Sequence, residues 1–204
     1  KNSQTVKFFQ LGIEWSGRYS DRLGSSKLEL SLTYSPGQGI LGSNDEDFIS
    51  LGGSGAEAFI VHLDAERTLR LGNHGNLLAR LHSQWSDSDL LASDQISAAG
   101  ATRVRGFDEV VGYANRGLVG TLEVQSKAWR TSAAGNFVVA AFCDGALLHK
   151  DTPTDVGDLL SSGLGLRWRF GDHFSGRADL GIPLSAPEGV DDDPMLHFSI
   201  LTIW

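Results

Sequence analysis

The chain has 204 residues, a formal net charge of −8, 41% hydrophobic residues and a single cysteine. This size and composition fit one sizeable domain, or a piece of a larger one, and exclude a disordered chain. The acidic balance argues against a nucleic-acid partner, since phosphate binding needs clustered Lys and Arg, and one cysteine excludes an intrachain disulfide.

Apolar and polar residues alternate in nine segments of the chain, and this period of two is typical of β-strands with one apolar and one polar face. No segment has a convincing helical period, and no run reaches the roughly 18 apolar residues of a membrane helix. We therefore predict an all-β fold of about nine strands. The segments are 9–15, 27–34, 59–66, 79–85, 118–125, 139–144, 163–170, 174–184 and 196–204.

The links between these segments alternate in length. The long links are roughly 36–57, 87–116, 148–158 and 185–194, and the tighter ones are 67–75, 130–136 and 171–173. Long links at one end and short links at the other are typical of up-and-down barrels of the outer membrane. The link from 16 to 26 is longer than this pattern expects.

A soluble antiparallel barrel or sandwich would also alternate, but two features favour a transmembrane β-barrel. We expect the strands to be about ten residues long, which matches a tilted membrane strand better than a soluble one. A basic residue facing lipid would cost about 2–4 kcal/mol at the middle of the membrane, so the strand arginines should face a wet lumen. These arginines are Arg167, Arg169 and Arg177; the aromatic residues expected at strand ends, at the membrane interface, include Trp15, Tyr34 and Trp85.

The long link 87–116 contains the stretch ATRVRGFDEV. Within it, the tetrapeptide Val-Arg-Gly-Phe at 104–107 follows the sequence Leu-Leu-x-Ser-x-Gln at 90–95 and precedes a predicted strand that contains Glu123. Together these features resemble the signature of the two-partner secretion transporters, the haemolysin secretion/activation proteins of the outer-membrane assembly-factor superfamily. The resemblance covers essentially the whole chain, and its core is the tetrapeptide Val104, Arg105, Gly106 and Phe107.

The resemblance implies that this loop folds into the barrel lumen, where its arginine pairs with an aspartate of a Phe-x-Asp-x-Gly motif. That motif matches Phe142 and Asp144, with Ala146 in place of its glycine. Glu123, on the polar side of its own strand, is a second possible acceptor for Arg105. A charge-assisted hydrogen bond of this kind contributes about 1.5–3 kcal/mol, so we expect the arginine to act as a latch.

The residues that follow the arginine and two aromatic residues of the last strand have expected roles as well. Gly106 would allow a positive φ at the loop tip, and Phe107 could wedge against the inner wall. Phe198 and Trp204 would form the C-terminal barrel signal.

The resemblance also implies an organisation and a function. Residues 1–204 would be the C-terminal part of a sixteen-stranded barrel, without the polypeptide-transport-associated domains that precede it. The complete protein would export a large unfolded haemolysin or adhesin through the outer membrane of a Gram-negative bacterium, surrounded by lipid. The alternatives are a barrel-assembly insertase of the same superfamily and, from another class, a passive porin or barrel adhesin.

Other chemistry has little support in the sequence. Six histidines are scattered without metal-ligand spacing, and we expect His62, His82 and His197 to hydrate the lumen, that is, to hydrogen-bond to its water. Nothing marks one serine as an activated nucleophile, so we expect no enzymatic activity. No nucleotide, redox group or other cofactor is implied.

Overall fold

The computed structural model describes residues 7, 9–41, 43–109, 111–131, 135–149, 157–171 and 173–203. Nine strands of this part of the chain form one antiparallel sheet in the order β1-β2-β3-β4-β7-β9-β10-β11-β12, which confirms the predicted fold class. Their bounds are β1 Leu11–Ser20, β2 Gly24–Pro36, β3 Glu57–Arg70, β4 Gly75–Ser86, β7 Gly117–Ser126, β9 Gly135–Leu148, β10 Leu159–Phe170, β11 Phe174–Ser185 and β12 Met195–Thr202.

Three short strands accompany this sheet. β8 (Trp129–Thr131) pairs with β9 as a tenth strand, off the main path. β5 (Ile96–Ser97) and β6 (Tyr113–Ala114) form a separate two-stranded sheet within the long link between β4 and β7.

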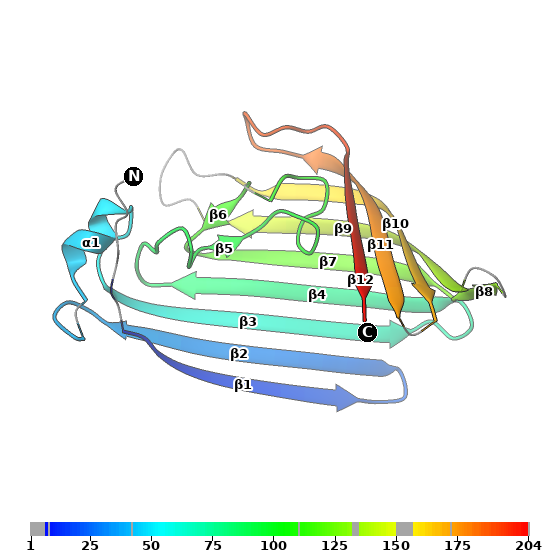
Figure 1. Ribbon diagram of the computed structural model, residues 1–204, viewed down its shortest axis with the longest axis horizontal. Coiled ribbons are helices and arrows are strands. Elements are labelled where there is room, and N and C mark those ends of the chain that lie inside the picture. The colour runs from blue at the N-terminus through cyan, green and yellow to red at the C-terminus, as the bar shows by residue number, and fades with distance from the viewer. Residues whose placement is uncertain are drawn as a thin grey trace.

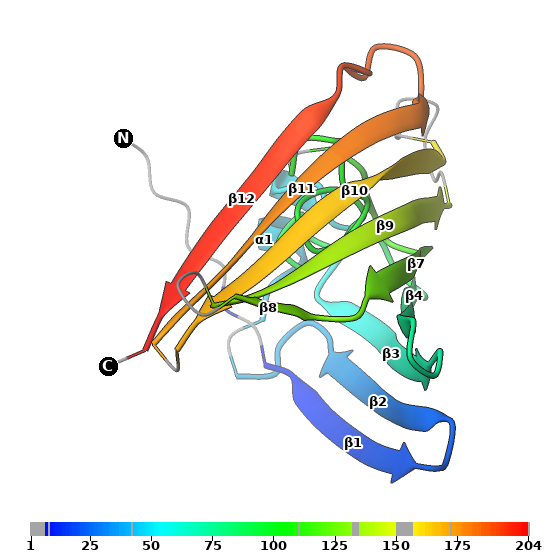
Figure 2. The ribbon, with the colours of Figure 1, turned by 90° about the vertical axis from the view of Figure 1, so that its right-hand side faces the viewer.

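The sheet is a curved wall, and the link between β4 and β7 lies on its concave side (Figures 1 and 2). We call this link, residues 87–116, the inner loop. Because successive strands run in opposite directions, the links alternate between the two ends of the wall. The inner loop leaves from the same end as α1, whereas the turn between β3 and β4 closes the opposite end (Figure 1).

The prediction of a long first link was wrong. β1 continues to Ser20 and β2 begins at Gly24, so only three residues separate the strands. The Asp21 carboxylate accepts hydrogen bonds from the backbone N–H groups of Leu23 and Gly24, both at 2.8 Å, and so stabilises a tight turn. The first link therefore obeys the alternation of long and short links. As a further consequence, Trp15 lies in the middle of β1 and not at a strand end.

The prediction of no helix was also wrong, because the link between β2 and β3 contains α1 (Asp45–Ser50). Asn44 caps this helix by accepting a hydrogen bond from the Glu46 N–H, and three acidic residues occupy its first turn, where they interact favourably with the helix dipole. Six residues are too few to show a helical period. Among the described residues, no helix is long and apolar enough to cross a membrane.

The two faces of the wall differ as the alternation predicts. On the convex face, large apolar side chains such as Leu122 and Leu164 are exposed. On the concave face, Arg167 and Arg177 bind carboxylate and carbonyl oxygens, which confirms that these arginines face inwards. An apolar outer face with this charged network on the inner one is the arrangement that a lipid-embedded barrel requires.

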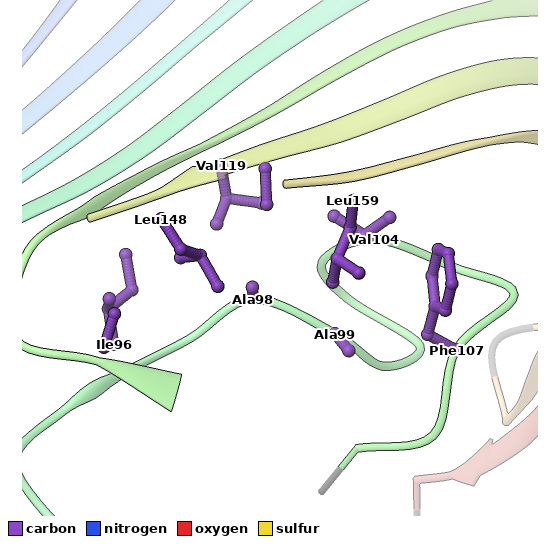
Figure 3. Close-up of a cluster of buried hydrophobic side chains, with 10 residues drawn as sticks. Ile96, Ala98, Ala99, Val104, Phe107, Val119, Leu148 and Leu159 are labelled. Atoms are coloured by element: carbon purple, nitrogen blue, oxygen red, sulfur yellow. The ribbon is translucent and has the colours of Figure 1, made fainter. Parts of the chain in front are cut away.

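A hydrophobic cluster attaches the inner loop to the concave face (Figure 3). The loop and the wall both contribute side chains to it, and Val104 and Phe107 are almost completely buried. Burying a side chain of this size stabilises a fold by about 1.5–3 kcal/mol, so the loop is a packed part of the structure. The loop contributes Ile96, Ala98, Ala99, Val104, Phe107 and Ala114, and the strands contribute Val119, Ala146, Leu148 and Leu159.

Ala146, the residue that replaces the glycine of the strand motif, belongs to this cluster and is 2% exposed. β9 continues through this position with regular pairing to Val119 on one side and Leu159 on the other. The departure from the motif therefore adds apolar contact without interrupting the strand.

Candidate functional site: a loop arginine among buried carboxylates

The tip of the inner loop is a tight turn made by its own backbone. The N–H of Val104 donates to the Ala98 carbonyl at 2.9 Å, and the N–H of Ala98 donates to the Gly112 carbonyl at 2.7 Å. Gly100 and Gly106 have φ angles of +113° and +99°, which side-chain-bearing residues rarely adopt. Glycines at these two positions let the chain reverse direction and direct Arg105 towards the wall.

Arg105 binds two carboxylates that come from neighbouring strands. Its Nε and Nη2 donate to the two oxygens of Asp144 on β9, at 2.7 and 2.9 Å, in the bidentate geometry that suits a guanidinium. Its Nη1 donates to Glu123 Oε2 on β7 at 2.6 Å. The backbone N–H of Arg105 also donates to Asp144, at 3.2 Å. The structure thus brings together the arginine and both acceptors named from the sequence.

The Phe142 ring forms one side of the same pocket. The Arg105 Cζ lies 3.4 Å from the centre of this ring, a cation–π contact between a guanidinium and an aromatic face. Arg105 is only 3% exposed. Burial by itself lowers the pKa of this guanidinium, but the hydrogen bonds and charges of Asp144 and Glu123 outweigh burial and raise the pKa above its usual value. Arg105 therefore carries its full charge in this pocket.

A second set of charges continues the site along β10 and β11, and the sequence analysis did not assign it. Asp179 is completely buried, and its two oxygens accept from Arg167 at 2.6 Å and from Arg177 at 2.8 Å. Arg105 Nη1 lies 3.5 Å from the same carboxylate. Arg167 also donates to Glu123, at 3.1 Å, so the two sets form one network. We call this site the arginine pocket; it consists of Arg105, Glu123, Phe142, Asp144, Arg167, Arg177 and Asp179.

One signal in the sequence could have found Asp179. It stands two residues after Arg177, on the face predicted to line the lumen, and a carboxylate beside an inward arginine is a natural partner. The contact with the inner loop was not predictable in this way, because it joins residues more than 70 positions apart.

The backbone of the loop tip rests directly on β11. A Cβ on Gly181 would lie 2.4 Å from the Gly106 nitrogen and 2.6 Å from the Arg105 carbonyl carbon, so only glycine allows this approach. The N–H of Gly106 donates to Nε2 of His197 on β12, at 3.1 Å. His197 was expected only to hydrate the lumen, and the structure gives it this additional contact with the loop tip.

Two glycines of β10 also make room for the network. A Cβ on Gly163 would meet the Phe142 ring at 2.4 Å, and one on Gly165 would meet Asp179 Oδ1 at 2.2 Å. The sequence analysis treated these residues only as the small side of a strand, and their effect is to admit the ring and the buried carboxylate.

The remaining predicted site residues lie elsewhere. Phe198 is exposed on β12, with its ring centre 5.7 Å from that of Trp168. Trp204 lies outside the described residues.

These features together define a class of protein. Long antiparallel strands with an apolar convex face and a charged concave face form the wall of a membrane β-barrel, and a buried arginine holds an internal loop against that wall. The family model described as "Haemolysin secretion/activation protein ShlB/FhaC/HecB" matches residues 2–168. The chain belongs to this family.

Similar proteins have related names. An "Outer membrane transporter CdiB" of Dickeya dadantii (strain 3937) is 26% identical over 201 residues, which cover 96% of this chain and 34% of that protein. An Escherichia coli protein with the same name is 30% identical over 118 residues, covering 57% of this chain and 20% of that protein. The chain is therefore an outer-membrane β-barrel protein, and it spans about a third of the length of the first of these relatives.

Solved structures share the fold. CdiB from Escherichia coli superimposes with a TM-score of 0.82 at 21% identity, over 97% of this chain and 37% of that one. CdiB from Acinetobacter baumannii gives a TM-score of 0.65 at 21% identity, over 95% of this chain and 33% of that one.

Proposed function

We propose that this chain is part of a two-partner secretion pore that exports a large unfolded exoprotein, such as a haemolysin or adhesin, across the outer membrane. The observation that carries the proposal is the burial of Arg105 between Asp144 and Glu123, which fixes an inner loop inside the wall of a barrel. Membership of the secretion/activation family supports it, as does the transporter name of the relatives.

The proposed pore needs more chain than these residues. Within the described part, β1 and β12 each pair with one neighbour only, and an unpaired strand edge in lipid leaves backbone groups unsatisfied. The Dickeya dadantii relative is about three times longer than the segment that matches this chain, which supports a larger barrel, proposed to have sixteen strands. This chain would be the C-terminal part of it, preceded by polypeptide-transport-associated domains, and its convex face would contact lipid.

The inner loop is proposed to act as a latched element of the lumen. It occupies the concave side of the wall, so a polypeptide can use that space only after the loop has moved (Figure 2). Removing one partner of a buried ion pair typically costs about 3–5 kcal/mol, so loss of Arg105 or of its carboxylate should disrupt the latch. The latch is reversible, because only hydrogen bonds, ionic contacts and packing hold it. No step of this function makes or breaks a covalent bond, so we assign no enzymatic activity and no cofactor.

Secretion of the partner tests the proposal. In a strain that expresses the full-length protein and its exported partner, Arg105→Ala and Asp144→Ala should each reduce secretion about tenfold or more, while the barrel still inserts into the outer membrane. The physical reason is shared: either change leaves a buried charge without its partner. Secreted partner and membrane-inserted barrel are measured on the same cultures.

Arg103→Ala is the matched control. Arg103 lies on the same loop and forms no ion pair with the described carboxylates of the arginine pocket, so the strain with this variant should secrete the partner normally. Normal secretion by both pocket variants would contradict the latch. If other outer-membrane barrels fail to assemble in a strain with one of these variants while the partner is still exported, the protein would instead be a barrel-assembly insertase.

A further inference from the structure

The charges of the arginine pocket are divided unequally between the wall and the loop. The wall contributes three carboxylates, Glu123, Asp144 and Asp179, and two guanidinium groups, Arg167 and Arg177. Its net charge within the network is therefore −1, from two positive and three negative groups. The inner loop contributes one charge, that of Arg105, and this charge makes the network neutral.

The wall also supplies the shape of the pocket. Among the described residues, every side chain that binds the Arg105 guanidinium comes from β7, β9 or β11. The Phe142 ring covers one face of the guanidinium, and the carboxylates lie around its edge. This arrangement is specific for a planar cation with several N–H donors, and an ammonium group matches it poorly.

The room for the guanidinium is likewise built into the strands. Gly163 and Gly165 leave space for the Phe142 ring and for Asp179, and Gly181 leaves space for the backbone that carries the arginine. The wall thus supplies the negative charge, the aromatic face and the space that the guanidinium occupies.

We propose that this pocket is a guanidinium receptor in its own right, with Arg105 as its resident ligand, and that arginine side chains of the exported polypeptide bind it when the inner loop has moved away. The second part rests on the proposed function, since it requires a polypeptide in the lumen. Without a cation, the wall keeps three carboxylates and only two guanidinium groups. An arginine of a passing extended chain offers the donor set that Arg105 withdraws, whereas a lysine offers a single point charge.

The resident ligand has an advantage over any external one. Arg105 is tethered, so its effective concentration at the pocket is on the order of millimolar or more. An external guanidinium can therefore be detected cleanly only when Arg105 has been removed.

The test uses the purified full-length protein with the substitution Arg105→Ala. Ethylguanidinium and ethylammonium are titrated at equal ionic strength, and the thermal unfolding midpoint and the single-channel conductance in a planar bilayer are recorded. The receptor predicts that ethylguanidinium raises the midpoint and lowers the conductance at a concentration at least tenfold below that of ethylammonium. Equal effects of the two cations would overturn it.

A double variant and the wild-type protein show whether ethylguanidinium binds in the arginine pocket. The double variant Arg105→Ala/Asp144→Asn should lose the preference for ethylguanidinium, because the bidentate acceptor has lost its charge, and the wild-type protein should not respond in this concentration range. A double variant that responds as the single variant does would place the binding elsewhere and overturn the proposal.

Peptides test whether arginine side chains of an exported polypeptide bind the pocket. An arginine-containing peptide should block the current through the Arg105→Ala pore at least tenfold longer than the matched lysine peptide, and equal dwell times would overturn this part. Binding of ethylguanidinium needs no partner protein. A wild-type strain that secretes nothing, with a pocket that still binds ethylguanidinium, would therefore refute the proposed function and leave the receptor standing.

Discussion

The concave face contains ion pairs in two regions, and they differ in burial far more than in distance. Beside the inner loop, on β2 to β4, Lys27 binds Glu29 at 2.8 Å and Arg80 binds Glu66 at 2.9 Å, with side chains 34–45% exposed. Beneath the loop, Arg105 binds Asp144 at 2.7 Å, with side chains 3% and 0% exposed. The inner loop covers the second region and excludes water from it.

This difference teaches which charges of a barrel lumen hold structure together. An exposed ion pair is screened and contributes about 0–1 kcal/mol, whereas loss of one partner from a buried pair costs about 3–5 kcal/mol. The two regions use the same residue types on the same face of one sheet. We therefore expect substitutions under the loop to have large effects and equivalent substitutions beside it to have small ones.

The largest effect is expected for Asp179→Ala. This change removes the carboxylate that Arg167 and Arg177 share, and leaves two guanidinium groups of the network without it. The free energy of unfolding should fall by about 3–5 kcal/mol, measured by urea titration of the full-length barrel in lipid vesicles. A loss below 1 kcal/mol would show that burial by the loop does not strengthen these pairs.

The next effect is steric and is expected for Gly181→Val. The new side chain would meet backbone atoms of Arg105 and Gly106, which cannot rotate away, and overpacking of this kind costs about 1–3 kcal/mol. The loop tip should leave the wall, so a protease should cut residues 100–107 at least ten times faster, with the strand content of the circular dichroism spectrum unchanged.

Gly12→Val is the matched control, because a Cβ at Gly12 meets no atom closer than 3.9 Å. Unchanged proteolysis of the Gly181 variant would refute the close approach of the loop tip to β11.

The contrast between these glycines shows how far the sequence could predict the site. The nine strands were predictable because the period of two is a local property, and Arg105 with Asp144 and Glu123 was predictable from a resemblance in motifs. Gly181 was not singled out, because its neighbour Gly106 is 75 positions away and only the curvature of the wall brings them together. The helix α1 and the turn at Asp21 were missed because each depends on one capping side chain rather than on a repeating pattern.

A smaller effect is expected at Asp21 in the turn between β1 and β2. Its pair with Arg67 is intermediate in exposure between the pairs of the two regions, with side chains 30% and 27% exposed. The hydrogen bond from Arg67 lowers the pKa of Asp21 below its ordinary value of 3.8, and the backbone N–H groups of Gly24 and Leu23 act in the same direction. A lowered pKa in the folded state means that the stabilisation is complete above the ordinary value and is lost as the pH falls through the folded value.

Acidification below about pH 4 should therefore loosen the turn between β1 and β2. Amide hydrogen exchange at Leu23 and Gly24, compared at pH 3 and pH 6 after correction for intrinsic exchange rates, measures this. In Asp21→Asn the corrected protection should not depend on pH over this range. A wild-type turn equally protected at both pH values would show that the carboxylate charge does not stabilise it.

The smallest effect is expected for Glu66→Gln, which removes the charge that Arg80 binds on the open part of the concave face. Both side chains are more than 40% exposed, so water replaces the lost partner, and the free energy of unfolding should change by about 0.5 kcal/mol or less. The same urea titration measures it, with Asp144→Asn as the buried counterpart at similar pair distance. If the two substitutions cost the same, exclusion of water by the inner loop is not what distinguishes the two regions, and the strength of the latch must come from the hydrophobic cluster around Val104 instead.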